Sequence, residues 1–530
     1  MAVSLRSLPV HQRVWLAAAL FALVGLLVQV WRLASLTASY DQGIFTQALW
    51  NGLRGHPFES TLSSQLSSAV IHGGELPAVG YHRLGQHFTP LLLLWAPLVG
   101  LMGPAGLAVL QVGLVTTAGL VLHRLARPWL PPAPAAMVAV SFYGANAVIG
   151  PTWGNFSDLC QLPLLMFLLL LGLEAGPPAL VAIPALLIPL VREDTGVVLV
   201  GVGLWLLVRR RRRWPLAFAL IVWGAGWVLL VTAVLMPLFS DDHARRFMVE
   251  NFGQYLAGRQ QASGPEVLAT GLAQPLALVR ELLSPPDQTL RYLLGQALPL
   301  MLVPLIALDS WLLMGLPLLG LLLARGDNNP LGITIRYTFL VVPGLFAGAA
   351  LWWRQRLALL ESRRLRRIWA GCVALSLLFT LTSNPHRSLS WLIPDSLSPW
   401  LQVPMAESWA HARQARAAVA LIPPDASVSA TTHLVPLLAR RSVVVRFPFA
   451  VSYRDRQGQE QPVEWIALDL GRLRRYAPAF HEDREMLAAA LERLQQVRGS
   501  YGLREARDGV LILQRGAPDD PAARSGLLLP

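Results

Sequence analysis

Long apolar runs recur through the first 383 residues of this chain, and this recurrence limits what the chain can fold into. A helix that crosses a membrane needs about 20 consecutive apolar residues, and several runs have this length. Of all 530 residues, 54% are hydrophobic and 14% are charged, and the mean hydropathy is +0.48. Such a composition is typical of lipid-embedded protein and argues against several soluble domains. The sequence therefore predicts a polytopic membrane protein.

The apolar runs predict a bundle of about eleven transmembrane helices. The segment 87–104 is also apolar, but Pro90 and Pro97 interrupt it, so we expect it to lie in the outer interface without crossing. The predicted spans lie near 14–36, 105–123, 134–150, 158–175, 177–191, 195–208, 214–239, 289–308, 310–324, 331–353 and 368–383.

Blocks of arginine between the apolar runs predict the orientation of the chain. The formal net charge is +13, the chain has no lysine, and arginine blocks precede the first span and follow the second, sixth and tenth spans. Cytoplasmic loops carry an excess of positive charge, and this count places all four blocks on one side. The N-terminus is then cytoplasmic, and the segment after the last span is extracytoplasmic. Charge arranged in this way indicates membrane orientation and not nucleic-acid binding.

The apolar runs stop after Ser383, which predicts two domains. Residues 1–383 form the mainly α membrane domain, with a long first outer loop at 37–86 and another outer loop at 240–288. In residues 384–530, short β-rich runs alternate with helical stretches such as 481–497, which predicts a small α/β domain on the outer face. We expect the end of this domain, from 516 onward, to be a loose tail.

Acidic residues stand at the predicted outer ends of several spans. Asp41, in "TASYDQGIFTQALWNG", follows the first span, and Asp158, in "TWGNFSDLCQLPL", begins a later one. Each could cap a helix, because aspartate is a preferred N-cap residue, or could belong to an outer-face site. The sequence leaves both interpretations open.

The segment "PLVREDTGVVL" places three charges between two apolar runs with almost no loop. Ionisable groups so close to the membrane are costly, which favours a functional role for Glu193 and Asp194. The alternative is a local ion pair between Arg192 and Glu193 in a tight turn.

Carboxylates that converge at the end of a helical bundle have two chemical uses. They can hold a divalent cation such as Mg²⁺ or Mn²⁺, or they can accept a proton from a hydroxyl. The planar guanidinium of Arg336, in "GITIRYTF", could bind the phosphate of a lipid carrier, or could serve as an interfacial anchor. Asn155 lies on the same predicted outer side.

Five segments resemble, in order, a family of bacterial multi-span membrane proteins whose function is not known. They are "YDQGIFTQALWNGLRGHPFEST", "HFTPLLLLWAPL", "FSDLCQLPLL", "VREDTGV" and "IPPDASVSATTHLVPLLARR" with "WIALDL". That family in turn is similar to the GT-C glycosyltransferases, which keep an acidic first outer loop and an active site at the outer membrane face. The resemblance implies a catalytic or metal-binding role for Asp41, a second metal ligand or supporting acid at Asp158, supporting acids at Glu193 and Asp194, and a substrate contact at His87.

The leading hypothesis is a glycosyltransferase of the bacterial inner membrane. It would take a sugar from a polyprenyl-phosphate carrier, with Asp41, Asp158, Glu193 and Asp194 as catalytic acids and His87, Asn155 and Arg336 as substrate contacts. Two alternatives remain open: a lipid or solute transporter with an acidic ion site, and a non-catalytic membrane scaffold.

Overall fold

The computed structural model describes residues 9–256, 258–325 and 330–527, which form two compact units. The first unit contains the described part of Met1–Leu27 together with Leu84–Leu92 and Val109–His386. The second contains Val28–Arg83, Leu93–Ala108 and the described part of Arg387–Pro530. This division differs from the predicted boundary at 383/384, because most of the first outer loop clusters with the C-terminal segment. Each unit is described by itself below.

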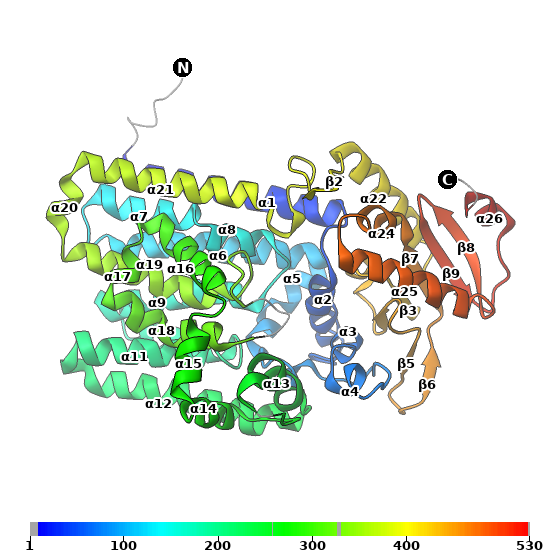
Figure 1. Ribbon diagram of the computed structural model, residues 1–530, viewed down its shortest axis with the longest axis horizontal. Coiled ribbons are helices and arrows are strands. Elements are labelled where there is room, and N and C mark those ends of the chain that lie inside the picture. Colours follow the sequence, from blue (N-terminus) through cyan, green and yellow to red (C-terminus); the bar gives the residue numbers. More distant parts are fainter. Residues whose placement is uncertain (1–8, 257, 326–329, 528–530) are drawn as a thin grey trace, which may run out of the picture. The chain divides into compact units, whose positions relative to one another are not determined.

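The first unit is a bundle of apolar helices, in which α11 packs on α12 and α18 packs on both α11 and α19 (Figure 1). The mainly α architecture predicted for this part of the chain is confirmed. Helices α1 (Val10–Ala34) and α6 (Pro104–Ala126) contribute residues to both units. The remaining long helices are α7 (Pro132–Tyr143), α8 (Asn146–Trp153), α9 (Leu162–Ala175), α10 (Ala179–Leu187), α11 (Gly196–Arg209), α12 (Trp214–Leu230), α16 (Pro286–Ala297), α18 (Leu308–Leu323), α19 (Thr338–Arg354) and α21 (Arg363–Thr382).

In the described part of the chain, four helical segments are long and apolar enough to cross a membrane: 10–34, 104–126, 211–238 and 363–382. The pair α7 and α8, bent by 40°, could form a fifth. Shorter apolar helices occupy Pro90–Met102, Ala179–Leu190, Gly196–Arg209, Leu308–Leu323 and Thr338–Arg354. The number of eleven spans stays a prediction.

The predicted span at 289–308 is wrong as a single helix. It is broken into α16, the 3₁₀ turn η10 (Leu298–Leu300) and α17 (Val303–Ile306), with Met301 and Leu302 at positive φ between the last two. The sequence "LPLMLVPLI" explains the break, because each proline removes a backbone donor and its ring obstructs the preceding turn.

The predicted outer loop at 240–288 folds into short helices. They are the π-helical turn η8 (His243–Phe247), α13 (Met248–Phe252), α14 (Gly264–Leu272) and α15 (Pro275–Leu282). Ser263 and Glu266 form a capping box that starts α14. Apolar side chains point outward from α14 and α15, with Leu276 86% exposed, which suits helices that lie against lipid.

The second unit contains the predicted α/β domain, which is confirmed. Its five-stranded sheet has the order β4 (Val444–Arg446), β3 (Val428–Ala430), β7 (Trp465–Asp469), β9 (Val510–Arg515) and β8 (Tyr501–Arg507). Strand β3 is parallel to β4 and β7, whereas β9 is antiparallel to β7 and β8. Two hairpins, β1 (Ser396–Leu397) with β2 (Trp400–Leu401) and β5 (Ser452–Arg454) with β6 (Glu460–Pro462), lie outside this sheet.

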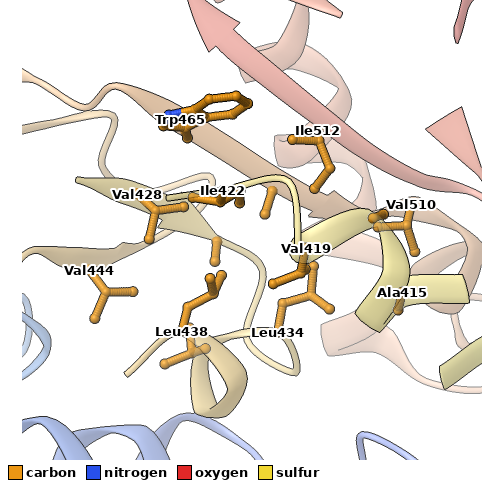
Figure 2. Packing of buried hydrophobic residues seen from close by; sticks show 14 of the residues in the cluster. Ala415, Val419, Ile422, Val428, Leu434, Leu438, Val444, Trp465, Val510 and Ile512 are labelled. Carbon is orange, nitrogen blue, oxygen red and sulfur yellow. The ribbon is translucent and has the colours of Figure 1, made fainter. Parts of the chain in front are cut away.

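Helices cover both faces of this sheet, because successive side chains of β9 alternate between two hydrophobic cores. Val510 and Ile512 belong to one core with Ala415 and Val419 of α22 (Met405–Val419), seen in Figure 2. Leu511 and Leu513 belong to a second core on the other face. The second core is completed by α24 (Leu470–Tyr476) and α25 (His481–Val497), so the helix predicted at 481–497 is also confirmed.

The predicted loose tail is wrong for 521–527. This segment forms α26 (Pro521–Leu527), and Ala523 is buried in the second core of the sheet. The burial of one small side chain is a signal too weak to read from the sequence.

The predicted first outer loop folds as part of the second unit, through α2 (Tyr40–Gly52), α3 (Thr61–Ser64) and α4 (Ser68–Ile71). Gln47 on α2 is fully buried, and its Nε2 donates to the carbonyls of Arg441 and Ser442, each at 3.2 Å. Its Oε1 accepts from Ser60 Oγ at 2.7 Å and from the Leu62 amide at 3.1 Å. One amide side chain therefore joins segments almost 400 positions apart in the chain.

The same loop covers the free edge of the sheet at β4. The hydroxyl of Thr61 donates to the carbonyl of Val444 at 2.6 Å, and Gln65 exchanges two hydrogen bonds with the backbone of Arg446, at 2.6 and 3.0 Å. These side chains satisfy backbone groups that an edge strand would otherwise expose. Gly43 allows α2 to approach closely, since a Cβ atom there would lie 2.4 Å from Val435.

Candidate functional site

A cavity of about 840 Å³ opens within the first unit, and its lining is mostly apolar. Leucine and valine side chains of α12, α14, α15 and α18 form its walls. Five side chains of the lining are acids, arginine or histidine, and we call this group the polar end: His87, Arg192, Glu193, Asp194 and His243. A cavity of this kind suits a ligand with a long apolar chain and a polar head.

Glu193 is the centre of the polar end. It lies between the 3₁₀ turn η4 (Ile188–Leu190) and α11, and its side chain is 8% exposed. One carboxylate oxygen is 2.9 Å from His87 Nδ1, and the other accepts from the backbone amide of Phe88 at 2.9 Å. The carboxylate thus orients the imidazole of His87, whose ring also packs on Phe247 with 4.7 Å between the ring centroids.

Arg192 and Asp194 form the second charged pair of the polar end. Arg192 Nε donates to Asp194 Oδ1 at 2.8 Å, and Nη2 contacts the other carboxylate oxygen. The sequence left open an ion pair between Arg192 and Glu193. The structure pairs Arg192 with Asp194 instead, because Asp194 allows a bidentate contact. Thr195 fixes the turn, because its hydroxyl bonds to the carbonyls of Ile188 and Arg192.

These contacts shift the pKa values of the polar end. Burial alone would raise the pKa of Glu193, but the charge and hydrogen bond of His87 and the charge of Arg192 outweigh it, so the pKa is lowered. Burial opposes the charge of Arg192, yet Asp194 above all, with Asp158 and Glu193, raises its pKa. Burial lowers the pKa of His243, although Glu193 opposes the shift. Glu193 is therefore ionised and His243 is neutral near pH 7.

The other predicted residues of the first unit are not among those that line the cavity. Asp158 is buried at the start of the 3₁₀ turn η3 (Asp158–Gln161), where its Oδ1 accepts from the Leu159 amide at 3.0 Å and from Ser157 Oγ at 3.1 Å. Arg336 lies 5.4 Å from the ring centroid of Tyr337, a cavity residue. Asn155 is half-buried, and its carbonyl accepts a long hydrogen bond from Gln111.

Asp41 belongs to the second unit and is described with that unit alone. It lies in the first turn of α2, whose N-cap residue is Ser39, so Asp41 is not the N-cap. Its charge raises the pKa of Arg446, although burial of that arginine dominates and leaves the pKa lowered. The structure therefore brings together His87, Glu193 and Asp194, and it does not place Asp41 relative to them.

Sequence reasoning missed His243 and Tyr337, both of which line the cavity. His243 follows Asp241 and Asp242, in a segment that reads as a surface loop. Tyr337 joins the polar end to Arg336, because the guanidinium carbons of Arg192 and Arg336 each lie 5.4 Å from its ring centroid. The adjacency of Arg336 and Tyr337 in the sequence was the available signal.

The predicted divalent cation finds no ligand set within the described residues, where no three His, Cys, Asp or Glu side chains are grouped to hold a metal. Asp41 and Asp158, the predicted ligands, belong to different units. Glu193 and Asp194 already accept hydrogen bonds from His87 and Arg192.

The fold and the cavity define a class: a mainly helical, multi-span membrane protein with a mostly apolar cavity and a small α/β domain. The sequence matches the family DUF2079, described as a predicted membrane protein, over residues 32–512. The chain belongs to this family, and the resemblance inferred from its motifs is confirmed.

Two solved structures are similar to the chain at a low level. ArnT from Cupriavidus metallidurans, bound to undecaprenyl phosphate, has 12% sequence identity and a TM-score of 0.49 over 95% of this chain and 99% of its own. An Archaeoglobus fulgidus oligosaccharyltransferase, in complex with Zn and sulfate, has 13% identity and a TM-score of 0.40 over 93% of this chain and 73% of its own. No curated protein matches the sequence. Similarity at these TM-scores does not identify an activity for this chain.

Proposed function

We propose that the chain is a membrane glycosyltransferase that takes a sugar from a polyprenyl-phosphate carrier and transfers it to an acceptor at the outer face of the bacterial inner membrane. The observation that supports this function is the 840 Å³ cavity, whose long apolar walls end at a compact group of charged side chains. A polyprenyl chain matches the walls, and a phosphate-linked sugar matches the polar end.

The transfer would proceed by attack of an acceptor hydroxyl on the anomeric carbon of the carrier-bound sugar. The bond from that carbon to the phosphate oxygen breaks, and polyprenyl phosphate leaves. His87, oriented by Glu193, would accept the hydroxyl proton through its other ring nitrogen, Nε2. Arg336 would bind the carrier phosphate, and Asn155 would contact the sugar.

The four predicted acids would have different roles in this function. Glu193 orients the base and Asp194 holds Arg192 at the polar end. Asp158 acts through its charge on Arg192. Asp41 keeps its predicted role as a base or metal ligand, which Asp41→Asn tests, and Mg²⁺ or Mn²⁺ dependence is tested by assay in EDTA followed by return of each ion.

The direct experiment measures binding and turnover of the carrier by the purified protein. We expect undecaprenyl phosphate to raise its melting temperature and undecaprenyl-phosphate-linked sugars to release free undecaprenyl phosphate when membrane extract supplies the acceptor. Glu193→Gln should lose turnover by about 10²-fold, as expected when a catalytic proton acceptor loses its orienting charge. Asp241→Asn, on an exposed acid outside the cavity, is the matched control.

Each outcome decides between the proposed activities. Release that needs Glu193 and the acceptor supports the transferase. Movement of labelled carrier across a vesicle membrane with no release would favour the transporter, for which Glu193 would be an ion site. Absence of any carrier binding would contradict both the transferase and transport of the carrier.

A further inference from the structure

Three arginines of the second unit gather on aromatic rings, in a group that we call the arginine cluster: Arg387, Arg446 and Arg472. The guanidinium carbons of Arg387 and Arg472 lie 4.9 and 4.7 Å from the ring centroid of the same residue, Tyr476. Arg387 also lies 3.8 Å from the centroid of Phe480, and Arg446 lies 4.8 Å from that of Phe449. Aromatic faces hold these cations in place without neutralising them.

His433 lies in the neighbourhood of all three arginines. Burial lowers its pKa well below the usual value, and the charges of Arg472, Arg387 and Arg446 lower it further. The imidazole is therefore neutral near pH 7. The positive charge of the region is carried by the guanidinium groups, whose charge does not depend on pH in this range.

Protein groups satisfy the arginine cluster only in part. Arg387 is 3.4 Å from Asp483, and Arg446 donates from Nε to Thr432 Oγ1 at 2.9 Å, with the charges of Asp41 and Glu482 nearby. Arg472 is 8% exposed, and within the described residues its buried Nε has no hydrogen-bond partner. A buried charged donor without an acceptor is unfavourable, so this group favours an anionic ligand.

We propose that the arginine cluster binds a phosphoryl group, with Arg472 as the buried donor and the half-buried Arg387 and Arg446 at its opening. A guanidinium presents two parallel N–H groups that match two phosphate oxygens, which is why arginine suits this ligand. The site lies wholly within the second unit and does not depend on the proposed transfer reaction. The phosphoryl group could be carried by a lipid or by a soluble molecule.

Chemical footprinting of the whole wild-type protein tests the proposal without a mutation. Phenylglyoxal modifies accessible arginines, and mass spectrometry reports the rate at each one. With inorganic pyrophosphate at about ten times its Kd, we expect modification of Arg387 and Arg446 to slow about tenfold, as mass action predicts. Arg504, exposed on β8, is the control and should react at the same rate.

A second arm with geranylgeranyl phosphate in micelles identifies the source of the group. Protection by pyrophosphate assigns a soluble phosphate, and protection by the lipid alone assigns a lipid headgroup. Either result supports the site. Protection of no cluster arginine by either probe, or equal protection of Arg504, would overturn it.

Variants give an independent measurement of the same site. Arg472→Gln should raise the Kd of the protecting probe by about tenfold or more, the loss typical of one charge-assisted contact. Arg504→Gln should leave the Kd unchanged. If Arg472→Gln does not fold, Arg387→Gln takes its place, and equal affinity in a folded cluster variant would refute the assignment.

Discussion

The two units use their buried polar side chains for different purposes. In the first unit, a few charged groups form the polar end of an apolar cavity, where Glu193 meets His87 and Asp194 meets Arg192. In the second unit, buried amides such as Gln47 join segments that are far apart in the chain. The most specific sequence motif, around Asp41, therefore mainly assembles a domain, whereas the short "VREDT" segment lines the cavity.

Glu193→Ala should give the largest effect on the first unit. The substitution leaves His87 and the Phe88 amide without their acceptor, and each hydrogen bond to a charged group typically contributes about 1.5–3 kcal/mol, so losing both should cost about 3–6 kcal/mol. Hydrogen exchange followed by mass spectrometry should show the loss in peptides that cover 84–92 and 188–209, with no change in β7 or β9. Asp241→Ala is the control, and equal effects on both units would contradict the comparison.

The lowered pKa of Glu193 also predicts how the stability of the first unit depends on pH. A carboxyl with a depressed folded pKa stabilises the unit above the pKa of a free glutamate, about 4.3, and this contribution is lost as the pH falls further. We expect the first unit of the wild-type protein to lose stability on acidification below this value. Glu193→Gln should remove this part of the dependence.

Gln47→Ala should destabilise the second unit by about 2–4 kcal/mol, since it leaves several buried backbone groups unpaired. The same exchange experiment should show faster exchange in α2 and β4, and unchanged exchange in α11 and α18. Gln457→Ala, on an exposed side chain, is the matched control. Unchanged exchange in β4 would show that the amide does not hold the loop.

Gly43→Ala should cost about 1–3 kcal/mol in the second unit, because the added methyl group overpacks against Val435. Gly80→Ala has open space at the corresponding position and should change the stability by less than about 0.5 kcal/mol. The denaturant midpoint of the α/β domain, followed by the hydrogen-exchange protection of β3 and β7, measures the effect of each substitution. A neutral Gly43→Ala would exclude close approach as the reason for glycine there.

His411 gives the smallest expected effect, and it appears only as a pH dependence. Burial lowers its pKa, but hydrogen bonds to Asp469 at 3.0 Å and Asp508 at 2.8 Å, with their charges, raise it overall. A raised histidine pKa stabilises the fold fully below about 6.5, and the contribution is lost as the pH rises through the folded pKa. Exchange in α22 should therefore quicken with pH beyond the intrinsic rate, and His411→Gln should abolish this excess.

Much of the architecture followed from periodicity and composition. The apolar runs predicted α9, α11 and α21 closely, and the β-rich runs predicted the sheet, because each signal is local. Pro299 and Pro304 in the sequence indicate a helix break, but the apolar length of 289–308 favours a single span, and the structure has the break. The short helices of 240–288 were missed because amphipathic segments of eight or nine residues give little signal.

The candidate site was only partly predictable for a physical reason. The charges in "VREDT" indicated a functional role for Glu193 and Asp194, because ionisable groups near lipid are energetically unfavourable and are usually kept for function. The partners of Glu193 could not be inferred, since His87 and His243 lie 106 and 50 positions from it and come near it only through the packing of helices. The role of Gln47 is hidden in the sequence for the same reason, because its partners lie near residue 441.

The participation of residues 28–83 in the second unit has a consequence for biosynthesis. The backbone groups of Arg441 and Ser442 that receive Gln47 are made only after most of the polypeptide has left the ribosome. Until then, residues 28–83 lack these hydrogen-bond partners while later helices enter the bilayer. Ribosome-stalled chains that end before residue 441 should therefore leave this segment open to protease, and full-length chains should protect it.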